Sequence, residues 1–160
     1  MSARVCVVAA DTKLETPEGP LTMRTVAKTP CSVLTRTDHG QVRFHMTKGA
    51  EQTGAAEPVI RVRLANGLSL RVGSEQVFYA DGMREVRAAD LKPGDELVGI
   101  FAFPAGYAYR TDDGREEVSK GTVAVSDVAP DGEADVFTFR VNQTGRFAFS
   151  AGVLGKADAE

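Results

Sequence analysis

The sequence has only two cysteines and two histidines in 160 residues. Cys6 and Cys31 make neither the paired spacing of a zinc site nor the framework of a disulfide-rich domain. We therefore expect no metal and no other cofactor, and two reduced cysteines of the kind found in the cytoplasm. A single disulfide between Cys6 and Cys31 stays open at this point.

The chain also lacks an excess of one charge and lacks long apolar runs. Its 19 basic residues against 22 acidic ones, without a basic block, argue against nucleic-acid binding. No apolar run approaches the roughly 18 residues of a transmembrane helix. The apolar stretch near the N-terminus is too short for a secretory signal. We expect no membrane contact and a cytoplasmic protein, or one incorporated into a particle assembled inside the cell.

No segment sustains a helical period, and short alternating segments separated by Gly, Pro and Asp turns run through most of the chain. This pattern predicts a compact all-β fold of many short strands in one domain, residues 1–160. Residues 21–28 are predicted to form a strand, and one short helical turn is expected at 88–91. Residues 48–57 are predicted to be a flexible loop, and residues 129–134 a turn-rich connector.

Two alternating segments around Asn66-Gly67 predict a β-hairpin. Its apolar positions are Ile60, Val62 and Leu64 before the turn and Leu68, Leu70 and Val72 after it. A two-residue turn would pair Leu64 with Ser69 and mix apolar and polar side chains on one face. A three-residue turn ending at Gly67 pairs Leu64 with Leu68 instead. Because a shift of one residue turns every side chain to the opposite face, the pattern selects this second register.

Three separated pieces of the chain share their order and spacing with one known family. The first is D-T-K-L-E-T-P-E-G at residues 11–19. The second is residues 71–97, with Phe78, an Asp81-Gly82 turn and P-G-D at 93–95. The third is the strand pair 136–141 and 146–149, followed by residues 152–154. Together these pieces resemble the Hedgehog/intein (Hint) family of self-processing domains, and the resemblance implies a Hint-like fold.

The resemblance also implies where the chemistry of that family would lie. In the family a Cys or Ser attacks the preceding peptide carbonyl, while a Thr and a His on the central strand activate that peptide. The family's spacing places the nucleophile on Val7, or on Cys6 if one residue has been inserted. The Thr and His fall on Gly73 and Gln76, and the terminal His-Asn of splicing members falls at or near Lys156-Ala157. The resemblance therefore implies a degenerate member.

Four side chains are candidates for a vestige of this chemistry: Cys6, Asp11, Thr12 and Gln76. Cys6 lies in the run VCVVAA, where a small buried hydrophobe is the favoured interpretation and a reactive nucleophile is the alternative. Gln76 is expected to hydrogen-bond a backbone group. Asp11 and Thr12 are expected to cap a turn and bond backbone amides.

Residues 103–120 depart from a minimal Hint core and predict a projecting hairpin around Asp113-Gly114. Tyr107 and Tyr109 lie on this segment. Exposed tyrosines supply a large contact area with a polar tip, so both residues are partner-binding candidates. An ordinary hairpin without a partner is the alternative interpretation.

The favoured function is a stand-alone, catalytically degenerate Hint-like domain with a structural or protein-interaction role. It would bind protein partners, for example as a component of a larger assembly such as a virion. The first alternative is residual autoprocessing through Cys6 by an N–S acyl shift, which would release residues 1–5. Few residues flank the motifs, so we expect no substantial flanking protein to splice. The second alternative, an all-β carrier of a small-molecule pocket unrelated to Hint chemistry, is less favoured by the three ordered motifs.

Overall fold

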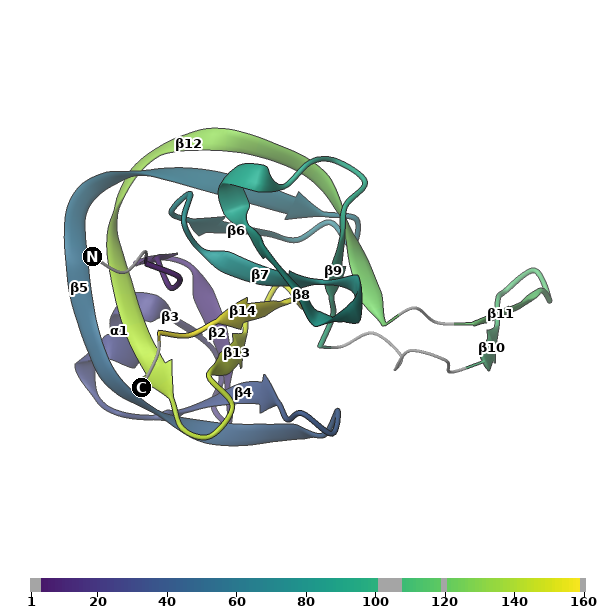
Figure 1. The fold of residues 1–160 in the computed structure, drawn as a ribbon, viewed down its shortest axis with the longest axis horizontal. Helices are drawn as coiled ribbons and strands as arrows, with labels where there is room; N and C mark the ends of the chain where they lie inside the picture. The colour runs from purple at the N-terminus through teal and green to yellow at the C-terminus, as the bar shows by residue number, and fades with distance from the viewer. Residues whose placement is uncertain (1–3, 101–107, 119–120, 159–160) are drawn as a thin grey trace.

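The computed structural model describes residues 4–100, 108–118 and 121–158, and most of these residues lie in β-strands (Figure 1). The strands are β1 (Val8–Ala9), β2 (Lys13–Thr16), β3 (Gly19–Thr22), β4 (Ser32–Arg36), β5 (Val42–Leu64), β6 (Ser69–Val72), β7 (Val77–Ala80), β8 (Arg84–Arg87), β9 (Glu96–Val98), β10 (Ala108–Arg110), β11 (Glu116–Val118), β12 (Thr122–Val141), β13 (Arg146–Ala148) and β14 (Leu154–Lys156). The helical elements are α1 (Met23–Lys28), η1 (Asp81–Met83) and η2 (Ala88–Asp90). The all-β prediction is confirmed.

The two long strands β5 and β12 give the molecule its shape. They pair antiparallel over most of their length and curve around the shorter strands, as the blue and light-green ribbons of Figure 1 show. β12 also pairs with β1, β1 with β6, and β6 with β5, so these four strands form a closed ring of pairings. Several register shifts interrupt the β5–β12 ladder. Such irregularities increase local twist and allow long strands to bend.

The prediction of loose structure at residues 48–57 and 129–134 is wrong. Residues 48–57 lie inside β5, and residues 129–134 lie inside β12. The two segments pair with each other or with nearby parts of the same ladder, for example Ala129 with Arg61 and Ala134 with Glu57. Their small and polar residues suit a strand exposed on both faces, because the partner strand satisfies the backbone hydrogen bonds whatever the side chains are.

The predicted register of the hairpin is confirmed. Ile60 lies opposite Val72 and Val62 opposite Leu70. Leu64 N–H donates to the Leu68 carbonyl at 2.8 Å, which closes a three-residue turn. Gly67 has φ of 85°, the left-handed conformation that such a turn requires. Leu68 departs from the expected inward face, since it is 50% exposed beyond the edge of the core.

The structure corrects the predicted strand at 21–28 and the count of helical turns. Residues from Met23 to Lys28 form α1, which begins after Thr22, whose side chain caps the helix by accepting from Thr25 N–H. Met23 and Val26, one helical turn apart, are the buried face. The turn predicted at 88–91 is present as η2. α1 and η1 are thus two further helical elements that alternation alone did not indicate.

A line of stacked phenylalanines forms the centre of the core. Phe139 contacts Phe147 at 4.6 Å between ring centroids, Phe147 contacts Phe149 at 4.8 Å, and Phe149 contacts Phe78 at 5.5 Å. These tilted and edge-to-face geometries are the favourable ones for aromatic pairs. Gly155 passes against the line so closely that a Cβ there would lie 2.6 Å from the Phe149 ring. The core therefore joins β7, β12, β13 and β14.

The segment predicted to be a projecting hairpin forms one where it is described. β10 and β11 pair with each other in a separate two-stranded sheet. Figure 1 shows this hairpin extending away from the rest of the molecule. In the described part of the chain, no helix has the length and apolar character needed to cross a bilayer.

Candidate functional site

The backbone of Val7 lies where the beginning of the chain meets the turn between β6 and β7. Val7 carbonyl accepts from Gly73 N–H at 2.9 Å, and Val7 N–H donates to Gln76 Oε1 at 2.8 Å. Just before it, the Val5 carbonyl accepts from Val77 N–H at 2.9 Å. Residues 5–7 are therefore held as an extended segment against residues 73–77.

Gly73 also touches the side chain of Val7. A Cβ at position 73 would lie 2.4 Å from Val7 Cγ1. The isopropyl group of Val7 thus occupies the space that any larger side chain at position 73 would need. A threonine and this valine do not fit together in the present arrangement.

Gln76 is completely buried and uses both ends of its amide. Its Oε1 accepts from Val7 N–H, and its Nε2 donates to the carbonyls of Val77 at 2.9 Å and Lys156 at 3.2 Å. The orientation of the amide is unambiguous because a backbone N–H can only donate and a carbonyl can only accept. Gln76 thereby links residues near the start of the chain to β14 near its end. The four positions that the sequence resemblance assigned to chemistry, 7, 73, 76 and 156, do converge here.

Cys6 points to the other side of the same segment, into the core. It is 1% exposed, and burial raises the pKa of its thiol to about 12, against smaller lowering contributions from hydrogen bonds to the Phe139 backbone and the Thr138 side chain. Both cysteines are free thiols, so the disulfide left open by the sequence is not formed. The Gln76 side chain contacts the amide nitrogen of Val7 and not that of Cys6. The site is therefore built around the Cys6–Val7 peptide bond, which puts Val7 in the place of a nucleophile.

Asp11 and Thr12 anchor the loop that follows β1. Thr12 Oγ1 donates to the Arg71 carbonyl at 2.6 Å and accepts from Arg71 N–H at 3.2 Å. The largely exposed Asp11 carboxylate pairs with Arg71 Nη1 at 2.8 Å. Both residues bind β6, and neither reaches the Val7–Gln76 contact through a hydrogen bond that the structure describes.

The structure does not describe the side chains of the two partner-binding candidates. Tyr107 lies outside the described residues, and Tyr109 lies on β10 with a side chain that is outside them as well. Over the described ranges, no group of three or more His, Cys, Asp or Glu side chains is placed to hold a metal ion.

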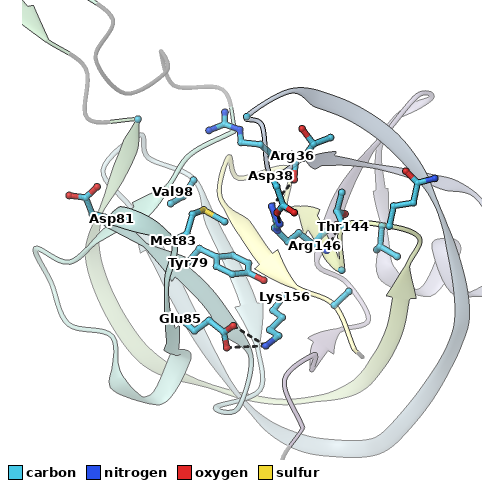
Figure 2. A pocket seen from close by; sticks show the side chains of 18 of the residues that line it. Arg36, Asp38, Tyr79, Asp81, Met83, Glu85, Val98, Thr144, Arg146 and Lys156 are labelled. Atoms are coloured by element: carbon cyan, nitrogen blue, oxygen red, sulfur yellow. Dashed lines mark hydrogen bonds and ion pairs between the residues drawn. The ribbon is translucent and has the colours of Figure 1, made fainter. Parts of the chain in front are cut away.

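Sequence reasoning missed a pocket of about 800 Å³ on the molecule, shown in Figure 2. Its walls include Arg36 from β4, Tyr79 from β7, Arg146 from β13 and Lys156 from β14. These residues are spread over more than two thirds of the chain and form no motif. The sequence signal is limited to a cationic residue at one end of each of three short strands, β4, β13 and β14.

No protein-family model matches the chain, and no curated protein sequence matches it. Solved structures match its fold. A variant of the Ssp DnaB mini-intein has a TM-score of 0.76 at 10% identity, covering 100% of this chain and 99% of that chain. A DnaB intein from Synechocystis sp. PCC 6803 has a TM-score of 0.73 at 10% identity, covering 96% and 99%.

A bacterial intein-like domain from Clostridium thermocellum is similar to the same extent, with a TM-score of 0.70 at 14% identity over 96% of this chain and 99% of that chain. At these identities the likeness concerns the fold and not the activity. Coverage is nearly complete on both sides, so the likeness concerns the fold as a whole. The chain therefore has the Hint fold that these inteins share, as its three ordered motifs predict.

Proposed function

We propose that this domain does not cleave or splice its own chain and that it serves a structural or protein-interaction role, as a component of a larger assembly. The observation that carries the proposal is the contact between Val7 and Gln76. Self-processing needs a nucleophile whose attack expels the amide nitrogen, and a group that protonates this nitrogen. The residues at the converging positions supply neither.

The side-chain amide of Gln76 presents its oxygen, which cannot donate a proton, to the peptide nitrogen of Val7. Its oxygen accepts from Val7 N–H, while its NH₂ is engaged by the Val77 and Lys156 carbonyls. A carboxamide does not exchange protons near neutral pH as an imidazole does. Loss of a general acid typically lowers a rate by about 10²–10⁴-fold. The alkyl side chain of Val7 removes the nucleophile in addition.

Cys6 is poorly placed to substitute for that nucleophile. Because burial raises the pKa of its thiol to about 12, the thiolate fraction at pH 7 is on the order of 10⁻⁵. Its burial and this low thiolate fraction favour a role in the core over residual autoprocessing.

The interaction role is supported by the β10–β11 hairpin. Its strands pair only with each other among the described strands, and it extends from the body of the molecule (Figure 1). Val118, at its end, is 64% exposed. An element that adds no strand to the main sheet and presents side chains to solvent is suited to contact a protein partner.

The loss of self-processing is tested by the intact mass of the full chain with a folded reporter domain fused before it and another after it. The protein is incubated with a strong thiol or with hydroxylamine, which capture a thioester. We expect one unchanged mass over days. Release of a reporter from the fusion, and no release from the Cys6→Ala fusion, would contradict the proposal and establish autoprocessing through Cys6.

The interaction role is tested by capturing partners with the tagged full chain. Tyr107→Ala and Tyr109→Ala are expected to weaken recovery of a partner. Phe44→Ala is the matched control, since Phe44 is an aromatic residue 45% exposed on β5, outside the hairpin. Loss of the partner with Phe44→Ala and not with the tyrosine variants would place the interface on β5 and contradict the role of the hairpin.

A further inference from the structure

The pocket of Figure 2 combines an apolar wall with three cationic side chains. Tyr79, Met83 and Val98 form the wall. Tyr79 and Val98 also belong to a buried apolar cluster that includes Ile100. Arg36 and Arg146 lie toward one end, and Lys156 lies toward the other (Figure 2). A volume of about 800 Å³ is within the range of pockets that bind small organic ligands.

Two of the three cations already have carboxylate partners. Lys156 Nζ lies 2.9 Å from Glu85 Oε2. Arg146 pairs with Asp38, donates to the Arg36 carbonyl at 3.0 Å, and places its guanidinium 5.9 Å from the centroid of the Tyr79 ring. These contacts fix Arg146, whose side chain is only 11% exposed.

Arg36 differs from the other two. Its Nε is buried without a hydrogen-bond partner, and the contact recorded for its Nη2 is a long one, 3.5 Å to the Ile100 carbonyl. Among the described residues no carboxylate forms an ion pair with it within 4 Å. Burial lowers the pKa of its guanidinium, as expected for a cation removed from water without an anion beside it. An anion in the pocket would supply a counter-charge to the Arg36 guanidinium.

The backbone around the pocket is also constrained. Met83 and Gln143 have φ of 62° and 69°, and both line the pocket. Residues other than glycine rarely adopt this left-handed backbone conformation. Those that do are often found at ligand sites, where the surrounding structure holds them in place. Two of the three non-glycine residues with this conformation in the described chain are found here.

We propose that this pocket binds a monoanionic carboxylate attached to an apolar body, with Arg36 as the residue that recognises the carboxylate. The planar guanidinium offers two parallel donors that match the two oxygens of a carboxylate. Tyr79, Met83 and Val98 cover the apolar body. The pocket adjoins the Val7–Gln76 contact through Lys156, whose carbonyl accepts from Gln76. The proposal does not depend on the function proposed above.

The charges of the pocket favour one negative charge over two. Asp38, Asp81, Glu85 and Asp158 line the pocket beside its three cations. A phosphomonoester carries about 1.5 to 2 negative charges at neutral pH and would be repelled by these carboxylates. Two sources present the favoured chemistry: a small free acid, and the carboxyl terminus of a peptide.

The test is a calorimetric titration of the full chain with four probes. Phenylacetate represents the free acid, and a short peptide ending in a free phenylalanine carboxylate represents the peptide terminus. Phenylacetamide and the same peptide with an amidated end are their neutral controls. Arg36→Gln is the test variant, and Arg43→Gln, an exposed arginine on the neighbouring β5 outside the pocket, is the matched control.

We expect at least one of the two carboxylates to bind and its neutral control to fail. Arg36→Gln is expected to weaken binding by about tenfold to a hundredfold, the value of a charge-assisted hydrogen bond, and Arg43→Gln by less than about twofold. If only one of the two carboxylates binds, the result shows whether the ligand is a small free acid or the carboxyl terminus of a peptide. Thermal melting checks that each variant folds. If Arg36→Gln does not fold, it is replaced in the titration by Arg36→Lys, which keeps the positive charge without the two parallel donors. Binding by neither carboxylate, equal binding of the neutral probes, or unchanged affinity in the folded Arg36 variant would overturn the proposal.

Discussion

At the scale of single residues, Gln76 has the most consequences for this domain. Its one side chain satisfies a backbone donor of Val7 and backbone acceptors of Val77 and Lys156. An unsatisfied buried polar group costs about 1–3 kcal/mol, so a residue that pairs three of them is costly to replace. Gln76 is thus a bridge between segments near the beginning and near the end of the chain.

Replacing Gln76 with alanine is therefore expected to destabilise the protein strongly. Val7 N–H and the Lys156 carbonyl would lose a buried partner, and we expect the free energy of unfolding to fall by about 2–4 kcal/mol. Chemical denaturation monitored by circular dichroism measures this change. Gln52→Ala is the control, because the Gln52 amide is exposed and bonds only Gly54; it should change stability by less than about 0.5 kcal/mol. A Gln76→Ala protein as stable as this control would contradict the bridging role.

Cys6 makes stability depend on alkaline pH. Its pKa in the folded chain is raised from the ordinary 9.0 to about 12. Below pH 9 the thiol is protonated in both states, and its contribution to stability is fully present. Above pH 9 the unfolded chain releases the proton while the folded chain keeps it, so deprotonation favours unfolding. We expect the free energy of unfolding to fall between pH 9 and about 12, by at most about 1.4 kcal/mol per pH unit.

Urea unfolding at a series of pH values measures this slope. Since burial also raises the pKa of the Cys31 thiol, the comparison is made in a Cys31→Ala background. Adding Cys6→Ala should remove the Cys6 part of the slope, even though it lowers stability at every pH by leaving a cavity. Equal slopes with and without Cys6 would mean that the thiol titrates normally in the folded protein.

At the scale of elements, the long strands and the β10–β11 hairpin behave differently. β5 and β12 contain stretches that look like loops, and they are ordered because each is the partner of the other. In β5, Gly49 allows close approach of Arg140 from β12, whose Nη2 would lie 2.4 Å from a Cβ at that position. The hairpin has no such partner among the described strands.

The hairpin should accordingly be dispensable for folding. Its ion pairs, Arg110 with Glu116 and Arg115 with Asp113, join largely exposed side chains and contribute little stability. We expect replacement of residues 108–118 by a Gly-Ser linker to change the melting temperature by no more than a few degrees, since loop length has a weak effect on stability.

Gly67→Val provides the contrasting variant in differential scanning calorimetry. Gly67 has φ of 85°, a conformation that costs other residues about 1–2 kcal/mol. This single change in the β5–β6 turn should lower the melting temperature more than removal of the whole β10–β11 hairpin. The reverse order would mean that the hairpin is part of the cooperative fold.

At the scale of the whole molecule, the fold brings the first and last described segments together. Residues 5–7 and 156–158 meet around Gln76 and Phe139, where Asp158 N–H donates to the Phe139 carbonyl at 2.9 Å. Both ends of the ribbon lie on the same side of the molecule in Figure 1. The fold persists at 10–14% identity to the inteins and the intein-like domain compared above. Such persistence is expected where core volume and strand pairing, and not particular residues, determine the fold.

The sequence predicted the parts of the fold that depend on neighbours along the chain. Alternation around Asn66-Gly67 set the register from Ile60 to Val72, because one slip would have exposed its buried face. The same reasoning failed for α1, whose buried residues Met23 and Val26 are three positions apart, a spacing that shares one face in a helix and alternates between faces in a strand. It also failed for residues 48–57, whose strand conformation comes from backbone pairing that side chains do not encode.

The candidate sites divide in the same way. The sequence by itself determined the strand class, the hairpin register and which residues stand at positions 7, 73 and 76, because spacing and periodicity are local properties of the chain. Only the tertiary structure decided that Val7 and not Cys6 faces Gln76, that Cys6 is sealed in the core, and that Arg36 lies in a pocket with Arg146 and Lys156. These facts depend on the packing of separate strands, which brings residues as far apart in the chain as Arg36 and Lys156, 120 positions, into the lining of one pocket.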